Sequence, residues 1–139
     1  MRERKSLPSA LDIAMLALAL IFAVTSLTVL GPCGQKPDGS WMVCHWAGNV
    51  ASGLAIVMST MALAHLLLGN PWAKIGIDVG LIPVSVLCML VPGVLIGLCR
   101  TSTMRCHTAM RPADILFSGL IIAIALIDIL VQKKRLKSE

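Results

Sequence analysis

The sequence predicts an all-α integral membrane protein, a bundle of four transmembrane helices. Of the 139 residues, 57% are hydrophobic and 14% are charged, with a mean hydropathy of +0.86, whereas a soluble domain is about half apolar and about a quarter charged. The apolar residues gather in four runs of the length needed to cross a bilayer core of ~30 Å. Because backbone groups in lipid must be paired within their own segment, each run is expected to be a helix.

The predicted spans cover residues 9–30, 47–68, 75–98 and 112–131 of a single transmembrane domain. The first span follows a basic N-terminal stretch, as the apolar region of a signal peptide does. Its apolar run is long for a signal peptide and lacks a small-residue cleavage site, so we retain it as a span.

The third span is expected to lie centrally in the bundle or to contact a partner. It contains Gly76-x-x-x-Gly80 and Gly93-x-x-x-Gly97, and small residues four positions apart let helices approach closely. Pro83 also lies within it and is expected to bend the helix. Four short helices with few polar groups leave little room for a substrate channel within one copy of the protein. We therefore expect the protein, embedded in the lipid bilayer, to form a homo-oligomer or to act as a subunit beside a transporter permease.

The distribution of basic residues predicts the orientation, because Lys and Arg in short loops are retained on the cytoplasmic side. One face carries Arg2, Arg4, Lys5, Lys74, Lys133, Lys134, Arg135 and Lys137. The other carries Lys36, Arg100, Arg105 and Arg111. The bias predicts a multi-pass protein of the cytoplasmic membrane with both termini inside. Trp41 and Trp46 then lie at the outer boundary and Trp72 at the inner one, where amphipathic rings prefer to sit.

An internal repeat predicts two duplicated helical hairpins. Residues 41–47 match residues 103–109 at Met, Cys, His and Ala, with an offset of 62 positions. Upstream, matched Asp, Gly and Cys positions, including Cys33 and Cys99, recur with an offset of 66. Each hairpin contains an even number of spans and inserts the same way, which predicts a pseudo-two-fold axis along the membrane normal.

Cysteines are concentrated in the two predicted outer loops, which hold Cys33, Cys44, Cys99 and Cys106, whereas Cys88 lies within a span. Thiols outside the cytoplasm oxidise, and an even number of loop cysteines is typical of disulfides. Cys33 with Cys44 and Cys99 with Cys106 would each close the mouth of one hairpin. Loops this short gain ~2 to 3 kcal/mol from such a bond in the chain-entropy model.

The same loops also favour a metal or haem site. Each hairpin supplies a thioether, a thiolate and an imidazole, a set that suits Cu(I) or another soft ion. The candidate metal ligands are Met42, Cys44, His45, Met104, Cys106 and His107. In a variant of this hypothesis, His45 and His107 are axial ligands of a haem whose propionates face Arg105 or its basic neighbours. The expected cofactor is therefore copper or haem.

Thiol exchange is a third interpretation of these residues. Cys44 and Cys106 each precede a histidine, whose imidazolium would favour the thiolate, and Cys33 and Cys99 would act as resolving partners. The chain has no Cys-x-x-Cys, the more usual arrangement in such enzymes.

Four ionisable residues, Asp12, His65, Asp78 and Asp128, lie within the spans, each about one turn from the predicted cytoplasmic end. Ionisable groups at such positions are costly and are functional candidates. Their shared depth allows a polar layer or part of a proton path. The alternative is an anchoring role, in which each group reaches water or pairs with a nearby lysine.

Four spans of this size, with Met-Arg-Cys-His at residues 104–107 ahead of the last span, resemble domain-of-unknown-function family 4418, a group of small four-helix membrane proteins. The resemblance covers nearly the whole chain. It implies an integral membrane protein without an established activity, accessory to an export-type ABC transporter.

The sequence contains no P-loop and no Ser-His-Asp or paired-carboxylate arrangement that would support a hydrolase. It also lacks a basic patch interleaved with aromatic residues, so no nucleic-acid partner is expected. The leading hypothesis is a non-catalytic membrane subunit whose extracytoplasmic Cys/His/Met site binds or senses a soft metal or haem beside a transporter. The alternatives are a membrane thiol-disulfide oxidoreductase and a purely structural, disulfide-stapled transporter subunit.

Overall fold

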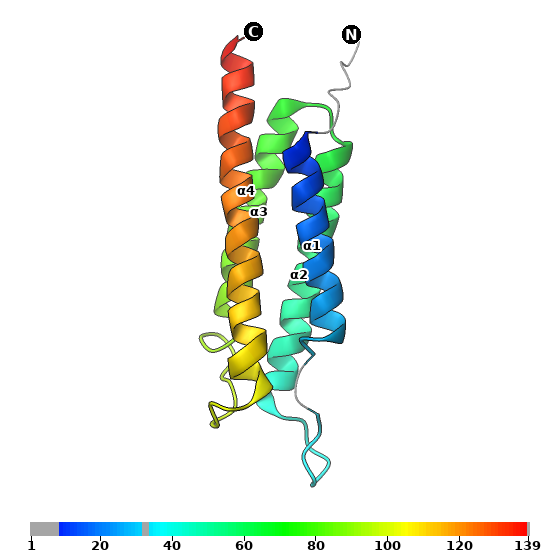
Figure 1. Ribbon diagram of the computed structural model, residues 1–139, viewed down its shortest axis with the longest axis vertical. Coiled ribbons are helices and arrows are strands. Elements are labelled where there is room, and N and C mark those ends of the chain that lie inside the picture. Colours follow the sequence, from blue (N-terminus) through cyan, green and yellow to red (C-terminus); the bar gives the residue numbers. More distant parts are fainter. Residues whose placement is uncertain (1–8, 32–33, 139) are drawn as a thin grey trace.

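A computed structural model describes residues 9–31 and 34–138, which form a bundle of four long helices (Figure 1). The elements are α1 (Ala10–Thr28), α2 (Val43–Leu67), α3 (Pro71–Leu90), the short π-helix η1 (Cys106–Met110) and α4 (Arg111–Ser138). The first three long helices, and the continuous helix formed by η1 and α4, are long and apolar enough to cross a membrane. The prediction of an all-α, multi-pass membrane protein is confirmed.

The start of α1, the end of α4 and the short α2–α3 connection lie together at one end of the bundle, called here the terminal end (Figure 1). The two longer loops, after α1 and after α3, lie at the opposite end, called here the loop end. Trp41 and Trp46 belong to the loop end and Trp72 to the terminal end, and all three side chains are exposed. Both ends of the bundle therefore carry the aromatic rings that prefer a membrane interface.

The helices pack as two hairpins, α1 with α2 and α3 with α4, which are the two most extensive contacts in the bundle. Buried positions alternate at spacings of three and four, the pattern of helices that pack nearly parallel. On α3 they are Lys74, Asp78, Leu81, Ser85 and Cys88, and on α4 they are Asp114, Ser118, Ile121, Ala125, Asp128 and Gln132. The duplication of the hairpins stays a prediction.

Large apolar side chains fill the middle of the bundle. The most deeply buried of them are Met15, Phe22, Met58, Leu81 and Ile121. Phe22 of α1 also stacks on Phe117 of α4, with ring centroids 5.0 Å apart, so that the two hairpins meet through aromatic rings. The described bundle thus has a packed centre between its two ends.

Small residues make up much of the buried face of α2, which packs on α1 and α3. On α2 the buried face consists largely of Ala47, Gly48, Ala51, Ala55 and Ala62. In lipid, such small side chains replace the hydrophobic effect with close backbone packing as the source of helix association. The Ser59 hydroxyl donates across the interface with α1 to the carbonyl of Ala19, at 3.0 Å.

Helix α3 ends at Leu90, whereas the predicted third span runs to residue 98. Pro92 cannot donate a backbone hydrogen bond to continue the helix. Gly93 has a φ of 101°, a conformation that favours glycine, and its N–H donates to the carbonyl of Ile96 at 2.9 Å. Gly93 therefore lies in a turn after the helix and Gly97 in the loop that follows, so the second predicted small-residue motif is not on a helix face.

The second and fourth helices begin earlier than the predicted spans, which start at residues 47 and 112. Cys44 and His45 lie in the first turn of α2, and Cys106 and His107 lie in η1. The Cys-His pair of each segment therefore lies on a helix, whereas Met42 and Met104 stand just before one. Each segment opens the second helix of its hairpin.

Candidate functional sites

Three cysteines from three parts of the chain converge at the loop end, and we call them the sulfur cluster. They are Cys44 of α2, Cys99 of the loop after α3, and Cys106 of η1, and their Sγ atoms all lie within 4.8 Å of one another. The Sγ of Cys99 is 3.2 Å from that of Cys44 and 3.9 Å from that of Cys106. Cys44 and Cys106 are buried, whereas Cys99 is half-buried and gives the cluster its contact with the surface.

Both Met-x-Cys-His segments adopt the same local turn. The backbone N–H of His45 donates to the carbonyl of Met42, and that of His107 donates to the carbonyl of Met104, each at 2.9 Å. In each segment the methionine stands just before the helix and the cysteine falls in its first turn. This turn explains how two stretches far apart in sequence can both present a sulfur at the same end of the bundle.

The loop carrying Cys99 is held by two further contacts. The His107 ring donates from Nε2 to the carbonyl of Cys99 at 2.7 Å. The Arg105 guanidinium donates to the carbonyl of Val29, just beyond α1, at 3.2 Å. His107 therefore contacts the backbone of a cluster residue, and Arg105, a predicted partner of haem propionates, contacts the chain instead.

His45 lies in an aromatic setting. Its ring stacks on Trp41 with centroids 4.0 Å apart, and the edge of Trp46 approaches it at 5.6 Å. The Asn49 amide donates to its Nε2 at 3.1 Å. Among the His, Cys, Asp and Glu side chains of residues 9–31 and 34–138, the ligand atoms that converge at this end are three thiol sulfurs and no imidazole nitrogen. Of the predicted ligands, the structure thus brings Cys44 and Cys106 together and adds Cys99.

The positions of the sulfur atoms do not follow the disulfide pairs predicted within each hairpin. Cys33, the predicted partner of Cys44, lies outside the described residues. Cys99 and Cys106 are separated by 3.9 Å between Sγ atoms, whereas a disulfide bond is about 2.05 Å long. Cys99 lies closer to Cys44, which belongs to the other hairpin. Sequence reasoning confined each pair to one hairpin and so missed this juxtaposition.

Asp38 is an exposed carboxylate in the loop that precedes α2. It accepts hydrogen bonds from the backbone N–H and the hydroxyl of Ser40, at 2.9 and 2.7 Å. These two donors lower the pKa of Asp38 below 3.8. Asp38 therefore stays ionised at physiological pH and holds its local turn.

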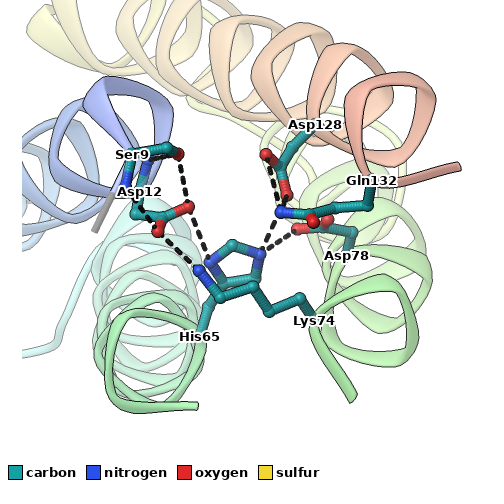
Figure 2. Close-up of polar contacts among 7 residues, drawn as sticks. All are labelled: Ser9, Asp12, His65, Lys74, Asp78, Asp128 and Gln132. Atoms are coloured by element: carbon teal, nitrogen blue, oxygen red, sulfur yellow. Dashed lines mark hydrogen bonds and ion pairs between the residues drawn. The ribbon is translucent and has the colours of Figure 1, made fainter. Parts of the chain in front are cut away.

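A second group of functional side chains, which we call the buried charge cluster, lies at the terminal end (Figure 2). Every helix contributes to it, and each ionisable member is at most 4% exposed. Its ionisable members are Asp12 of α1, His65 of α2, Lys74 and Asp78 of α3, and Asp128 of α4. Their convergence follows from the shared depth that the sequence indicates.

Asp12 is the best-satisfied carboxylate of this cluster. It forms a capping box with Ser9, whose backbone N–H and hydroxyl donate to it at 3.0 and 2.9 Å. Lys74 forms an ion pair with it from α3. Lys74 was counted from the sequence as a loop residue that orients the protein, but it is buried and connects the two hairpins.

His65 stands between three carboxylates (Figure 2). Its Nδ1 is 3.6 Å from Asp12, and its Nε2 is 3.3 Å from Asp78 and 3.2 Å from Asp128. Gln132 donates to Asp128 at 3.3 Å. The His65 imidazole thus connects α2 with α1, α3 and α4.

Sequence reasoning missed Asp114, which is buried near the other end of the α3–α4 interface. It lies close to the Cys88 thiol, as does Ser118. Neither Oδ2 of Asp114 nor the Ser118 hydroxyl has a hydrogen-bond partner among the described residues. The spacing of four and three that leads from Asp114 to Ser118 and Ile121 was the available signal, because it places this carboxylate on the same face of α4 as Asp128.

Comparison with known proteins yields one family. The family model described as "Domain of unknown function (DUF4418)" matches residues 15–131. No curated protein matches the chain. No solved structure matches it either.

Proposed function

The chain belongs to the DUF4418 family, and we propose that its sulfur cluster binds a soft metal ion, Cu(I) foremost, on the extracytoplasmic side of the membrane. The observation that carries this proposal is the convergence of three Sγ atoms from two hairpins within 4.8 Å. Thiolates ligating one ion at about 2.3 Å in tetrahedral geometry stand roughly 3.8 Å apart. The separations of 3.2 and 3.9 Å around Cys99 lie on either side of that value.

The local structure supports ligation by thiolates. Cys44 lies in the first turn of α2, where the partial positive charge of the helix start favours a negative sulfur. An all-sulfur set selects soft ions, since carboxylate and water ligands suit hard ions instead. Haem ligation has less support, because the His45 and His107 rings are already engaged with Asn49 and with the Cys99 carbonyl.

The charge at the two ends supports the proposed orientation. The last turns of α4 carry an exposed basic group at the terminal end, consisting of Lys133, Lys134, Arg135 and Lys137. Basic residues next to a span are retained in the cytoplasm. We accordingly propose that both termini lie on the cytoplasmic side of the membrane and that the sulfur cluster lies on the other side.

An accessory role fits the packed centre of the bundle. Met58, Leu81 and Ile121 occupy the middle of the membrane region and leave the cluster separated from the terminal end. The protein therefore holds or senses an ion at one face, and passing it across the membrane falls to a transporter permease or another partner. Half-buried Cys99 is the point at which a partner ligand can approach the ion.

The test is a metal titration of the purified protein in detergent under anaerobic, reducing conditions. Cu(I) is supplied from a competing chelator, and bound metal is counted for wild type, Cys99→Ser, Cys44→Ser and the control Cys88→Ser. We expect one ion per chain in wild type and in Cys88→Ser, because Cys88 lies within α3 outside the cluster. Cys99→Ser and Cys44→Ser should each lose tight binding.

Equal metal binding by Cys99→Ser and wild type would contradict the proposal. Cys33→Ser belongs in the same series, because its metal content shows whether this remaining cysteine supplies a further ligand. Zn²⁺ is titrated in parallel. Stronger retention of Zn²⁺ than of Cu(I) would contradict the choice of ion while leaving the ligands in place.

Thiol-disulfide exchange is the second candidate, favoured by one observation. The sequence assigned Cys99 as a resolving partner, but its Sγ lies within 3.9 Å of the sulfurs of both Cys44 and Cys106, which favours Cys99 as the attacking thiol and those two as its resolving partners. In such exchange a thiolate attacks a substrate disulfide, forms a mixed disulfide and expels a thiolate, and a second cysteine then releases the reduced substrate.

A glutathione redox buffer tests this alternative. If Cys99 is the attacking thiol, the double variant Cys44→Ser/Cys106→Ser, which lacks both resolving thiols, should accumulate glutathione on Cys99, detected as added mass on its peptide. Wild type should carry far less. Equal glutathionylation of the two proteins would contradict exchange chemistry at this site.

A further inference from the structure

The buried charge cluster contains more negative than positive charge. Asp12, Asp78 and Asp128 supply three carboxylates, whereas Lys74 supplies one positive charge and His65 supplies a second only when its ring is protonated. All five side chains are at most 5% exposed. One uncompensated negative charge in a membrane interior is strongly unfavourable, so this arrangement calls for one additional positive charge.

The hydrogen bonds of the cluster show which carboxylate lacks a donor. Both oxygens of Asp12 already accept donors, from Ser9 and Lys74. Asp128 accepts from His65 and Gln132. Asp78 is fully buried, yet neither of its carboxylate oxygens has a hydrogen bond in the described structure. Asp78 is therefore the carboxylate of this cluster that lacks a hydrogen-bond donor among the described residues.

Asp78 and Asp128 compete for one donor. Oδ1 of Asp78 and Oδ2 of Asp128 are 3.3 and 3.2 Å from the same Nε2 of His65, which carries a single N–H. The two carboxyl groups therefore meet at one nitrogen, from α3 and from α4. Two neighbouring carboxyl groups can hydrogen-bond to each other only if one of them carries a proton.

We propose that Asp78, with Asp128 and His65, forms a proton-binding site. In this site the proton stays on Asp78, whose O–H donates a hydrogen bond to the Asp128 carboxylate. This site is independent of the metal proposed at the loop end. The proton gives one of the two orphan oxygens of Asp78 a hydrogen bond to Asp128, neutralises the excess charge and leaves the His65 N–H for Asp128. Figure 2 shows both carboxylates turned toward the imidazole from α3 and α4.

The proton is exchanged with water at the terminal end. Asp12 is the third residue of α1 and His65 is the third from the end of α2, so the cluster is about one turn from that end. Toward the loop end, Leu81 and Ile121 close the α3–α4 interface with fully buried apolar side chains. A proton can therefore enter from the terminal side while the apolar layer blocks its passage across the membrane.

Proton binding is coupled to the docking of the two hairpins. Asp12 and His65 belong to α1 and α2, whereas Lys74, Asp78 and Asp128 belong to α3 and α4. Figure 2 shows these charged side chains around Asp78, with neutral Gln132 beside them. Loss of the proton from Asp78 restores the excess negative charge at this contact and weakens the docking there.

The test combines infrared spectroscopy with thermal unfolding of the full chain in lipid nanodiscs. A protonated carboxyl group gives a C=O stretch that a carboxylate lacks. We expect such a band at neutral pH, lost at high pH and lost in Asp78→Asn. Asp38→Asn, at an exposed loop position, should keep it. Asp114→Asn identifies any separate acid band from the other buried carboxyl group.

The stability of Asp78→Asn distinguishes a protonated Asp78 from an ionised one. The asparagine amide can donate to Asp128 as the protonated acid does, so this variant should match the melting temperature of wild type at neutral pH. It should also lose the fall in melting temperature that wild type shows at high pH. Asp78→Ala, which cannot donate, should melt at a lower temperature.

Two results would overturn the proposal. The first is an infrared spectrum unchanged by both Asp78→Asn and Asp128→Asn. The second is a melting temperature that rises with Na⁺ or Mg²⁺ in wild type but not in Asp78→Asn, without an acid band. That result would show that a metal cation, rather than a proton, neutralises Asp78.

Discussion

His107 supports the sulfur cluster without belonging to it. Its backbone N–H caps the turn at Met104, and its ring donates to the carbonyl of Cys99. A side chain that fixes the position of a metal ligand typically affects affinity about 10- to 100-fold when it is removed. His45 has the same place in the other hairpin but contacts Trp41 and Asn49 instead.

The two histidines should therefore differ as variants. His107→Ala is expected to weaken Cu(I) affinity by roughly tenfold or more, because Cys99 loses the contact that holds its backbone. His45→Ala should leave the affinity unchanged. The measurement is a competition titration against a Cu(I) chelator. An equal, complete loss of binding in both variants would show instead that both imidazoles ligate the ion.

Ser9 is a second residue whose effect is local. Its hydroxyl accepts from the Asp12 backbone N–H at 3.3 Å and donates to the Asp12 carboxylate. Ser9→Ala removes this cap and is expected to lower the free energy of unfolding by ~1 kcal/mol. Ser40→Ala, in an exposed loop turn, serves as the control. Unfolding by a denaturing detergent measures both, and equal stability of the two variants would contradict a stabilising cap.

The elements were predicted more securely than their ends. Apolar run length identified four helices, because lipid leaves a long apolar segment no other conformation. It could not locate the boundaries, because apolar residues continue past the turn that Pro92 and Gly93 impose after α3. Polar residues such as Asn49 conversely lie within the helix that brings Cys44 into the sulfur cluster.

The contact between α2 and α3 gives a prediction at the same scale. A Cβ at Gly80 would stand 3.1 Å from the terminal methyl of Met61, whereas a Cβ at Gly76 would meet nothing within 4 Å. Gly80→Ile should therefore lower the free energy of unfolding by about 1 to 3 kcal/mol, as overpacking does. Gly76→Ile should cost clearly less. A thermal unfolding series compares them, and equal destabilisation would contradict the described helix contact.

At the scale of the whole molecule, the sequence indicated which helices form each hairpin, but it did not indicate which residues of one hairpin contact residues of the other. The repeat suggested equivalent places for Cys44 and Cys106, and both do open a helix. That Cys99 lies nearer to Cys44 than to Cys106 depends on how one hairpin docks against the other. The same applies to Lys74, whose partner Asp12 is 62 positions away.

The orientation of the whole molecule is testable by labelling intact cells with a membrane-impermeant thiol reagent. In a cysteine-free background, Gly39→Cys at the loop end should be labelled from outside. Ser138→Cys at the terminal end should be labelled only after permeabilisation, since the basic end of α4 is expected inside. The reverse pattern would place the sulfur cluster in the cytoplasm.

The most direct test of the sulfur cluster is X-ray absorption spectroscopy of the copper-loaded protein at the metal edge. We expect a ligand shell made of sulfur alone, at about 2.3 Å, the usual metal–thiolate distance for an ion of this size. Cys88→Ser should give the same spectrum. A shell dominated by nitrogen or oxygen, or a protein that binds no copper when reduced, would contradict the proposed function.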